Sequence, residues 1–206
     1  MEVYDNENDQ VDALKRFFAE NGKALAVGVV LGIGALVGWR FWNGHQDASA
    51  REVSLAYQNV TSVMKADKPE SITAVENFVS SNKNTYGALA ALDVANQLVG
   101  KNDLSAAATQ LQTGLANTSD DNLKALINLR LARIQVQQKQ ADDALKTLDS
   151  IKGDGWTAMV ADIRGEALLS KGDKQGARDA WSKGVASGTS PALREMMQMK
   201  INNLSS

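Results

Sequence analysis

Residue types that carry catalysis are scarce in this sequence. It contains one histidine, His45, and no cysteine. A nucleophilic triad needs a histidine that a third group orients, and a zinc centre needs several histidine or cysteine ligands. His45 stands alone, just beyond the aromatic residues that end at Trp42. We therefore predict no catalytic residues and no metal site.

The acidic pairs of the sequence stand where helices are expected to begin. Asp120 and Asp121, and likewise Asp142 and Asp143, precede helical patterns, and the helix dipole stabilises negative charge at that end. A calcium loop needs oxygen ligands at alternate positions before a glycine, and no segment has that spacing. A phosphate loop follows a strand, whereas the glycines of residues 172–176 lie between two helical patterns. We predict a protein that has no cofactor and is not an enzyme.

The element that dominates the sequence is an apolar stretch from Ala24 to Trp42, with no charge between Lys23 and Arg40. A hydrocarbon core ~30 Å thick is spanned by about 20 apolar residues in a helix. Aromatic residues gather at the far end, where amphipathic rings settle at the headgroup boundary. Small residues, which mark the cleavage site of a signal peptide, do not follow. The sequence predicts one transmembrane helix, residues 23–42.

Glycines of this predicted helix form two small-xxx-small pairs. Such pairs let a second helix approach closely within a bilayer. The alternative is that glycine is simply tolerated in a membrane helix. We predict as partner-binding residues of the membrane helix Gly28, Gly32, Gly34 and Gly38.

A short amphipathic helix is predicted just before the span. Val11, Leu14, Phe17 and Phe18 share one helical face. Such a stretch either docks a cytoplasmic protein or lies at the membrane interface. Residues 1–10 are acidic with few apolar side chains, so we expect them to be disordered.

Positive charges beside the span predict its orientation. Lys15, Arg16 and Lys23 precede it, whereas Arg40 and Arg51 are the cations within about 20 residues after it. Because lysine and arginine stay on the cytoplasmic side, we predict a bacterial inner-membrane protein with a cytoplasmic N-terminus. The predicted parts are a cytoplasmic tail with the amphipathic helix, 1–22, the transmembrane helix, 23–42, and a periplasmic domain, 43–206.

The periplasmic part repeats one pattern of small and large residues. A small residue is followed twelve positions later by another, and four positions after that by a large one. A fainter copy includes Ala74 and Phe78. A single helical hairpin cannot bury both faces, so stacked hairpins are needed for a core. The copies are Ala95, Ala107 and Leu111; Ala132, Ala144 and Leu148; and Gly165, Ala177 and Trp181.

This pattern resembles the tetratricopeptide repeat, in which small residues let paired helices pack closely. The fold class predicted is therefore all-α, with a single N-terminal transmembrane helix followed by a tetratricopeptide-like helical-repeat domain. An unrelated bundle with alanine-rich seams is the alternative. Leu92, Leu129 and Asp162 stand where some relatives carry a clamp for C-terminal carboxylates, so the resemblance does not imply tail capture. It implies a concave partner-binding face of Asn96, Val99, Arg133, Val136, Glu166 and Leu169.

A terminal helix is predicted over residues 191–204, covering the last repeat. It contains Met196, Met197 and Met199. Methionines on such a helix either fill gaps in the packing or form an adaptable binding surface.

The segments NENDQV, KRFFAENGKALAVG, GEALLSKGDKQGAR and EMMQMKINNL resemble the ancillary subunits of the bacterial SecYEG translocon. The resemblance implies association with SecYEG and with the membrane-anchored periplasmic chaperone PpiD. It also implies hand-over of exported client proteins and a cytoplasmic link to the Rcs response regulator. A membrane-tethered envelope or cell-division scaffold is the alternative function. The 22 Lys+Arg and 24 Asp+Glu give a net charge of −2 and form no basic stripe, so no nucleic-acid partner is expected.

Overall fold

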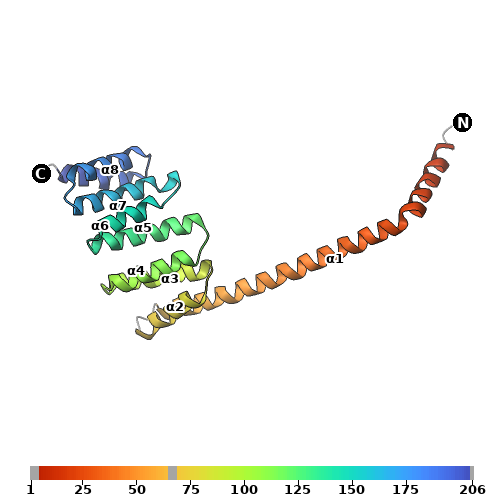
Figure 1. Ribbon diagram of the computed structural model, residues 1–206, viewed down its shortest axis with the longest axis horizontal. Helices are drawn as coiled ribbons and strands as arrows, with labels where there is room; N and C mark the ends of the chain where they lie inside the picture. The colour runs from red at the N-terminus through yellow and green to blue at the C-terminus, as the bar shows by residue number, and fades with distance from the viewer. Residues whose placement is uncertain (1–4, 65–68, 205–206) are drawn as a thin grey trace. The chain divides into compact units, whose positions relative to one another are not determined.

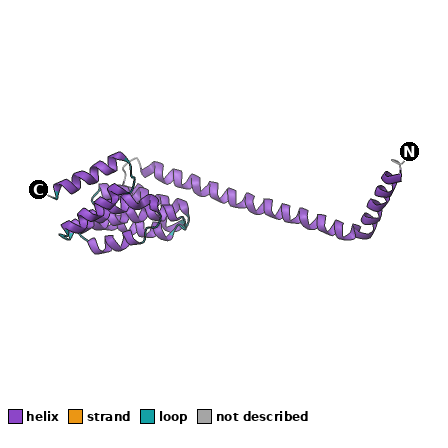
Figure 2. Cartoon of the chain, turned by 90° about the horizontal axis from the view of Figure 1, so that it is seen from above, coloured by secondary structure: helices purple, strands orange, loops and turns teal. Residues whose placement is uncertain are grey.

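The computed structural model describes residues 5–64 and 69–204, and within these ranges it contains helices and loops but no strand (Figures 1 and 2). The all-α prediction is confirmed. The chain divides into two compact units, Met1–Val53 and Ser54–Ser206. The helices are α1 (Asp5–Met64), α2 (Pro69–Ser81), α3 (Thr85–Gly100), α4 (Leu104–Ala116), α5 (Asp121–Gln137), α6 (Ala141–Asp149), the 3-10 turn η1 (Asp154–Trp156), α7 (Thr157–Ser170), α8 (Lys174–Ala186) and α9 (Pro191–Asn203).

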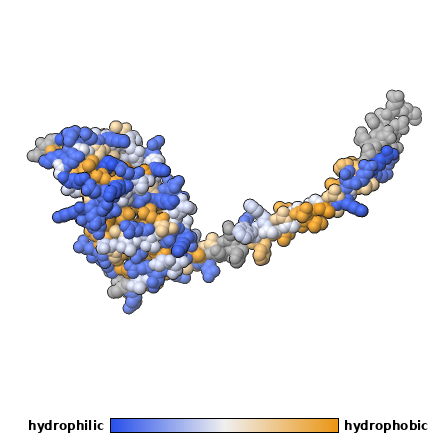
Figure 3. All heavy atoms as spheres, viewed as in Figure 1, coloured by the Kyte–Doolittle hydropathy of each residue, from blue (hydrophilic) through white to orange (hydrophobic). Residues whose placement is uncertain are grey.

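The described part of the first unit belongs to α1 and holds a candidate membrane span, Leu14–Asn43, none of which is buried inside the protein. Figure 3 shows its apolar side chains as an orange stretch. Thirty helical residues extend about 45 Å, which exceeds a hydrocarbon core of ~30 Å. The candidate range includes both the predicted transmembrane helix, 23–42, and part of the amphipathic lead-in, because α1 continues through both without a break. Residues 5–10 are helical too, so the prediction of disorder is wrong for them.

The turns within the three central hairpins share one geometry. Asn102 (φ 62°), Lys139 (φ 62°) and Gly172 (φ 84°) each adopt the left-handed conformation. In each turn the next residue donates its N–H to a carbonyl five positions back, which is the Schellman motif that ends a helix. These bonds are Asp103 to Leu98 (2.8 Å), Gln140 to Gln135 (2.8 Å) and Asp173 to Leu168 (3.0 Å).

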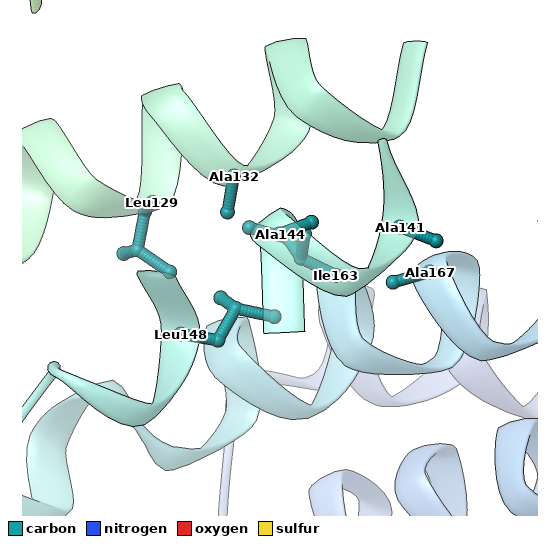
Figure 4. Close-up of a cluster of buried hydrophobic side chains, with 7 residues drawn as sticks. All are labelled: Leu129, Ala132, Ala141, Ala144, Leu148, Ile163 and Ala167. Atoms are coloured by element: carbon teal, nitrogen blue, oxygen red, sulfur yellow. The ribbon is translucent and has the colours of Figure 1, made fainter. Parts of the chain in front are cut away.

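The core of the second unit lies between the paired helices. All nine small and large positions of the predicted repeat are buried, and in Figure 4 those of α5 and α6 meet Ile163 and Ala167 of α7. The third copy carries a larger ring, Trp181, which is 1% exposed. A Cβ on Gly165 would lie 2.2 Å from Trp181 Nε1, so glycine replaces the alanine of the other copies. The repeat prediction is confirmed.

Helix α2 begins at Pro69. Proline fits the first turn of a helix because its missing N–H would be unpaired there. The predicted terminal helix is α9, whose Met197 is fully buried against Trp181 and Ala177. Met197 therefore fills a gap in the packing.

Candidate partner-binding groove

A groove of about 480 Å³ opens between α3, α4 and α5. Residues spaced three or four apart on α3 form one wall, because such residues share a helix face. A matching row on α5 forms the other wall, and Leu111 of α4 contributes from between them. The α3 wall includes Leu92, Asp93, Asn96 and Val99, and the α5 wall includes Leu126, Arg130, Arg133, Ile134 and Gln137.

The groove gathers three of the six predicted concave-face residues, Asn96, Val99 and Arg133. The other three lie elsewhere. Val136 is half-buried against the hydrophobic cluster of α5, α6 and α7, and Leu169 is 38% exposed. Glu166 forms an ion pair with Lys200 of α9. A binding role for all six stays a prediction.

Sequence reasoning missed Arg130 and Asp93, both of which line the groove. Arg130 could have been found, because it precedes the predicted Arg133 by three positions on the same helix. Asp93 likewise precedes the predicted Asn96 by three positions on α3, but its contact with Tyr57 could not have been found, because that residue is distant in sequence. The Tyr57 hydroxyl donates to Asp93 Oδ2 at 2.7 Å, across 36 positions.

This tyrosine holds the end of α1 against the repeat domain. The Tyr57 ring lies 6.3 Å from Phe78 of α2 and 5.7 Å from Tyr86 of α3, centroid to centroid. Burial raises the pKa of Tyr57 to about 12, and the hydrogen bond and negative charge of Asp93 add to the rise. The hydroxyl therefore stays protonated at neutral pH and donates to Asp93, which forms part of the groove wall.

An ionic network around one buried carboxylate lies beside the groove and joins α5, α7 and α9. The Asp162 side chain is fully buried, and a buried carboxylate requires charged partners. Arg133 approaches its Oδ2 at 3.2 Å and Lys200 its Oδ1 at 2.6 Å. Lys200 also donates to Glu166 at 2.6 Å and lies 5.7 Å from the centroid of the Trp181 ring.

The network keeps Lys200 charged. Burial alone lowers the pKa of an ammonium group, but the hydrogen bonds and charges of Asp162 and Glu166 outweigh burial and raise the pKa of Lys200. Asp162 is thus a structural carboxylate whose charge is neutralised by two cations. Sequence analysis identified Asp162 only as the residue at a clamp position.

The acidic pairs lie at helix starts, as predicted. Asp120 Oδ1 accepts the Leu123 N–H at 2.7 Å and caps α5. Asp142 lies in the first turn of α6, and its hydrogen bond and ion pair with Lys171 lower the pKa of its carboxyl group. The side chain of His45 lies outside those described. Among the side chains that are described, no three His, Cys, Asp or Glu residues cluster as metal ligands would.

The membrane glycines lie on an uninterrupted helix. A Cβ built on any of the four would meet no atom within 4 Å. With 3.6 residues per turn, the pair Gly28 and Gly32 points about 120° away from the pair Gly34 and Gly38. The pairs therefore offer two separate faces rather than one. A hollow of about 460 Å³ includes Gly28, together with Phe17, Asn21, Ala24, Leu25 and Val29.

Comparison with known proteins agrees with this architecture. The tetratricopeptide repeat-like domain family matches residues 15–206, which excludes the unrelated bundle. The Ancillary SecYEG translocon subunit of Escherichia coli (strain K12) is 72% identical over 205 residues, covering 100% of both chains. The chain belongs to the family of ancillary SecYEG translocon subunits. The Haemophilus influenzae member is 35% identical over 199 residues, covering 96% of this chain and 97% of its own.

Members of this family diverge considerably while keeping their length. The Neisseria gonorrhoeae subunit is 22% identical, yet the alignment covers 99% of this chain and 100% of its own. No solved structure matches the chain significantly. The architecture of the groove and of the ionic network therefore comes from the present structure.

Proposed function

We propose that this chain is a non-catalytic, single-pass inner-membrane protein that acts as an ancillary subunit of the SecYEG translocon. The 72% identity to the Escherichia coli subunit, over 205 residues, carries this proposal. The candidate span Leu14–Asn43 and the repeat domain supply the two parts such a subunit needs. One part anchors the chain and the other presents a binding surface.

The proposed orientation places the N-terminus in the cytoplasm and the repeat domain in the periplasm. The lysines and arginine ahead of the uncharged core that begins at Ala24 support it: Lys15, Arg16 and Lys23. In this orientation the repeat domain lies on the side where exported proteins emerge. The short N-terminal segment is then the part available to a cytoplasmic partner such as the Rcs response regulator.

The repeat domain is proposed to contact a PpiD-like periplasmic chaperone and to aid the hand-over of exported proteins. Anchoring beside the translocon raises the local concentration of the groove around an emerging chain, so weak contacts suffice. The groove supports this role because it combines apolar side chains such as Val99 with the polar groups of Asn96 and Arg133. A mixed surface of this kind suits extended polypeptides of varied sequence.

Site-specific photocrosslinking in intact membranes tests the proposal. A crosslinker replacing Gly32 should capture translocon subunits, and one replacing Val99 should capture the chaperone or exported chains. A crosslinker at Asp179, an exposed position on α8 outside the groove, serves as the control. Crosslinks mainly to cell-division or other envelope proteins would instead favour the alternative, a membrane-tethered scaffold.

A further inference from the structure

We propose that the groove binds an extended polypeptide segment through an acidic side chain flanked by apolar ones, with Arg130 and Arg133 contacting the carboxylate. This inference rests on the proposed function, since it names the kind of segment that the groove accepts. The carboxylate is an internal aspartate or glutamate rather than a chain terminus.

Two arginines give the groove lining its positive charge. Arg130 is exposed and lines the groove, and it has no ion-pair partner among the described residues. Arg133 follows three positions later on α5, so both guanidinium groups leave the same side of the helix. The one carboxylate of the groove lining, Asp93, accepts the Tyr57 hydroxyl and so is held at the α1 side. The lining therefore holds two arginines against one carboxylate, although the whole chain carries a net charge of −2.

The side chains around these arginines determine which residues can flank the acidic residue in the bound peptide. Val99, Leu111 and Ile134 line the same groove, and they offer apolar surface to the residues beside the acid. Guanidinium groups bind carboxylates through paired hydrogen bonds that a lysine cannot reproduce. A basic segment would be repelled by the arginines, and a wholly apolar one would leave them without a partner.

Arg133 can exchange Asp162 for a ligand carboxylate because a second cation, Lys200, remains paired with Asp162. Withdrawing the sole partner of a buried carboxylate is strongly unfavourable. Here Lys200 holds Asp162 Oδ1 at 2.6 Å, whereas the Arg133 contact is longer, 3.2 Å, and its side chain is 46% exposed. When Arg133 turns to a ligand, Lys200 remains between two carboxylates, Asp162 and Glu166. Water can stabilise the second of these, because the Glu166 side chain is 35% exposed.

Lys200 is therefore a positioning residue for Arg133. It contacts no ligand, yet its charge decides whether Arg133 remains bound to Asp162. Replacing Lys200 by methionine would leave Arg133 as the only cation on a buried carboxylate and hold it there. Arginine at this position would keep the charge.

Binding of matched peptides to the full-length chain in nanodiscs of uncharged lipid tests the proposal. The probes are short leucine-rich peptides, acetylated and amidated, carrying either an internal glutamate or a glutamine. We expect the glutamate peptide to bind at least about fivefold more tightly, by fluorescence anisotropy, and the preference to shrink as salt is raised. Arg130→Gln should abolish the preference, whereas Arg194→Gln, an exposed arginine of α9 outside the groove, should retain it.

A second arm uses Lys200→Met and Lys200→Arg. We expect Lys200→Met to reduce glutamate-peptide affinity by about threefold or more while glutamine-peptide affinity stays unchanged. Lys200→Arg should preserve the preference. A structural defect in α9 alone would weaken both peptides equally, and that result would overturn the positioning role.

Several results would overturn the proposal itself. Equal affinity for the glutamate and glutamine peptides, or no binding of either, contradicts it. A third probe is the glutamine peptide with a free C-terminus, and preference for it alone would show that the groove takes chain ends instead. If crosslinks from position 99 to exported chains persist in any of these cases, the proposed function stands and only the carboxylate assignment is wrong. Loss of translocon crosslinks from position 32 would contradict the proposed function, whatever the peptide preference.

Discussion

Gly165 and Trp181 form a size-matched pair where α7 packs on α8. The equivalent pair of the preceding hairpin is Ala132 with Leu148. Because a Cβ on Gly165 would lie 2.2 Å from Trp181 Nε1, the larger ring requires the smaller partner. We predict that exchanging both residues for alanine and leucine preserves the packing, whereas either exchange alone disrupts it.

The structure gives the size of each effect. Trp181→Leu removes a ring that is 1% exposed and whose Nε1 donates to the Asp162 carbonyl at 3.0 Å. The cavity and the lost hydrogen bond together should cost about 3–5 kcal/mol. Gly165→Ala should cost about 1–3 kcal/mol through overpacking, partly offset by a gain in helix propensity of up to ~1 kcal/mol. The double variant should lose at least ~1 kcal/mol less than the summed single losses.

Urea unfolding of the full-length chain, followed by helical circular dichroism, measures these differences in the free energy of unfolding. Hydrogen exchange of peptides from α7, α8 and α9 shows whether the loss is local, as expected for stacked repeats. Trp156→Leu is the matched control, because Trp156 is only half-buried. Additive losses would refute the size match. A loss below about 1 kcal/mol for Trp181→Leu would show that the ring does not fill the core.

Three further predictions concern a turn, a titration and the topology. Lys139→Gly should stabilise the domain by about 0.5–1 kcal/mol in urea unfolding, because Lys139 has φ 62°, whereas Gly172→Ala should destabilise it. In the folded protein the pKa of Tyr57 is about 12, above its ordinary 10.0. Its protonated hydroxyl therefore contributes to folding stability below pH 10, and this contribution should be lost as the pH rises toward 12. Tyr57→Phe should lose less folding stability than the natural chain between pH 10 and 12, and an identical dependence of stability on pH would contradict this prediction. Protease added to spheroplasts should digest residues 43–206 while a tag at Met1 stays protected, and protection of both would contradict the proposed orientation.

The repeat pattern could be predicted because it depends on residues close in sequence. The offset between small residues such as Ala132 and Ala144 is fixed by helix length and by one short turn. A packed hairpin needs small residues where its helices approach most closely, so the pattern appears in the sequence itself. The same reasoning found the acids at helix starts.

The candidate site was predicted only in part because its walls come from different helices. The resemblance to the tetratricopeptide repeat placed Asn96, Val99 and Arg133 on this surface. The contact between Asp93 and Tyr57 joins residues 36 positions apart, so no local pattern in the sequence indicates it.

Asp162 is a buried carboxylate whose charge is balanced by cations from two different helices. At a position where some tetratricopeptide relatives carry a clamp residue, this chain has an acid, which by itself would repel a carboxylate. Lys200 reaches it from α9, 38 positions away, and Arg133 reaches it from the groove. With Lys200 and Arg133 both paired to Asp162, Arg130 is the cation of the groove lining that has no ion-pair partner among the described residues. In the proposed complex Lys200 keeps Asp162 paired while Arg133 turns to the ligand, so the C-terminal helix would act on a groove formed by earlier repeats.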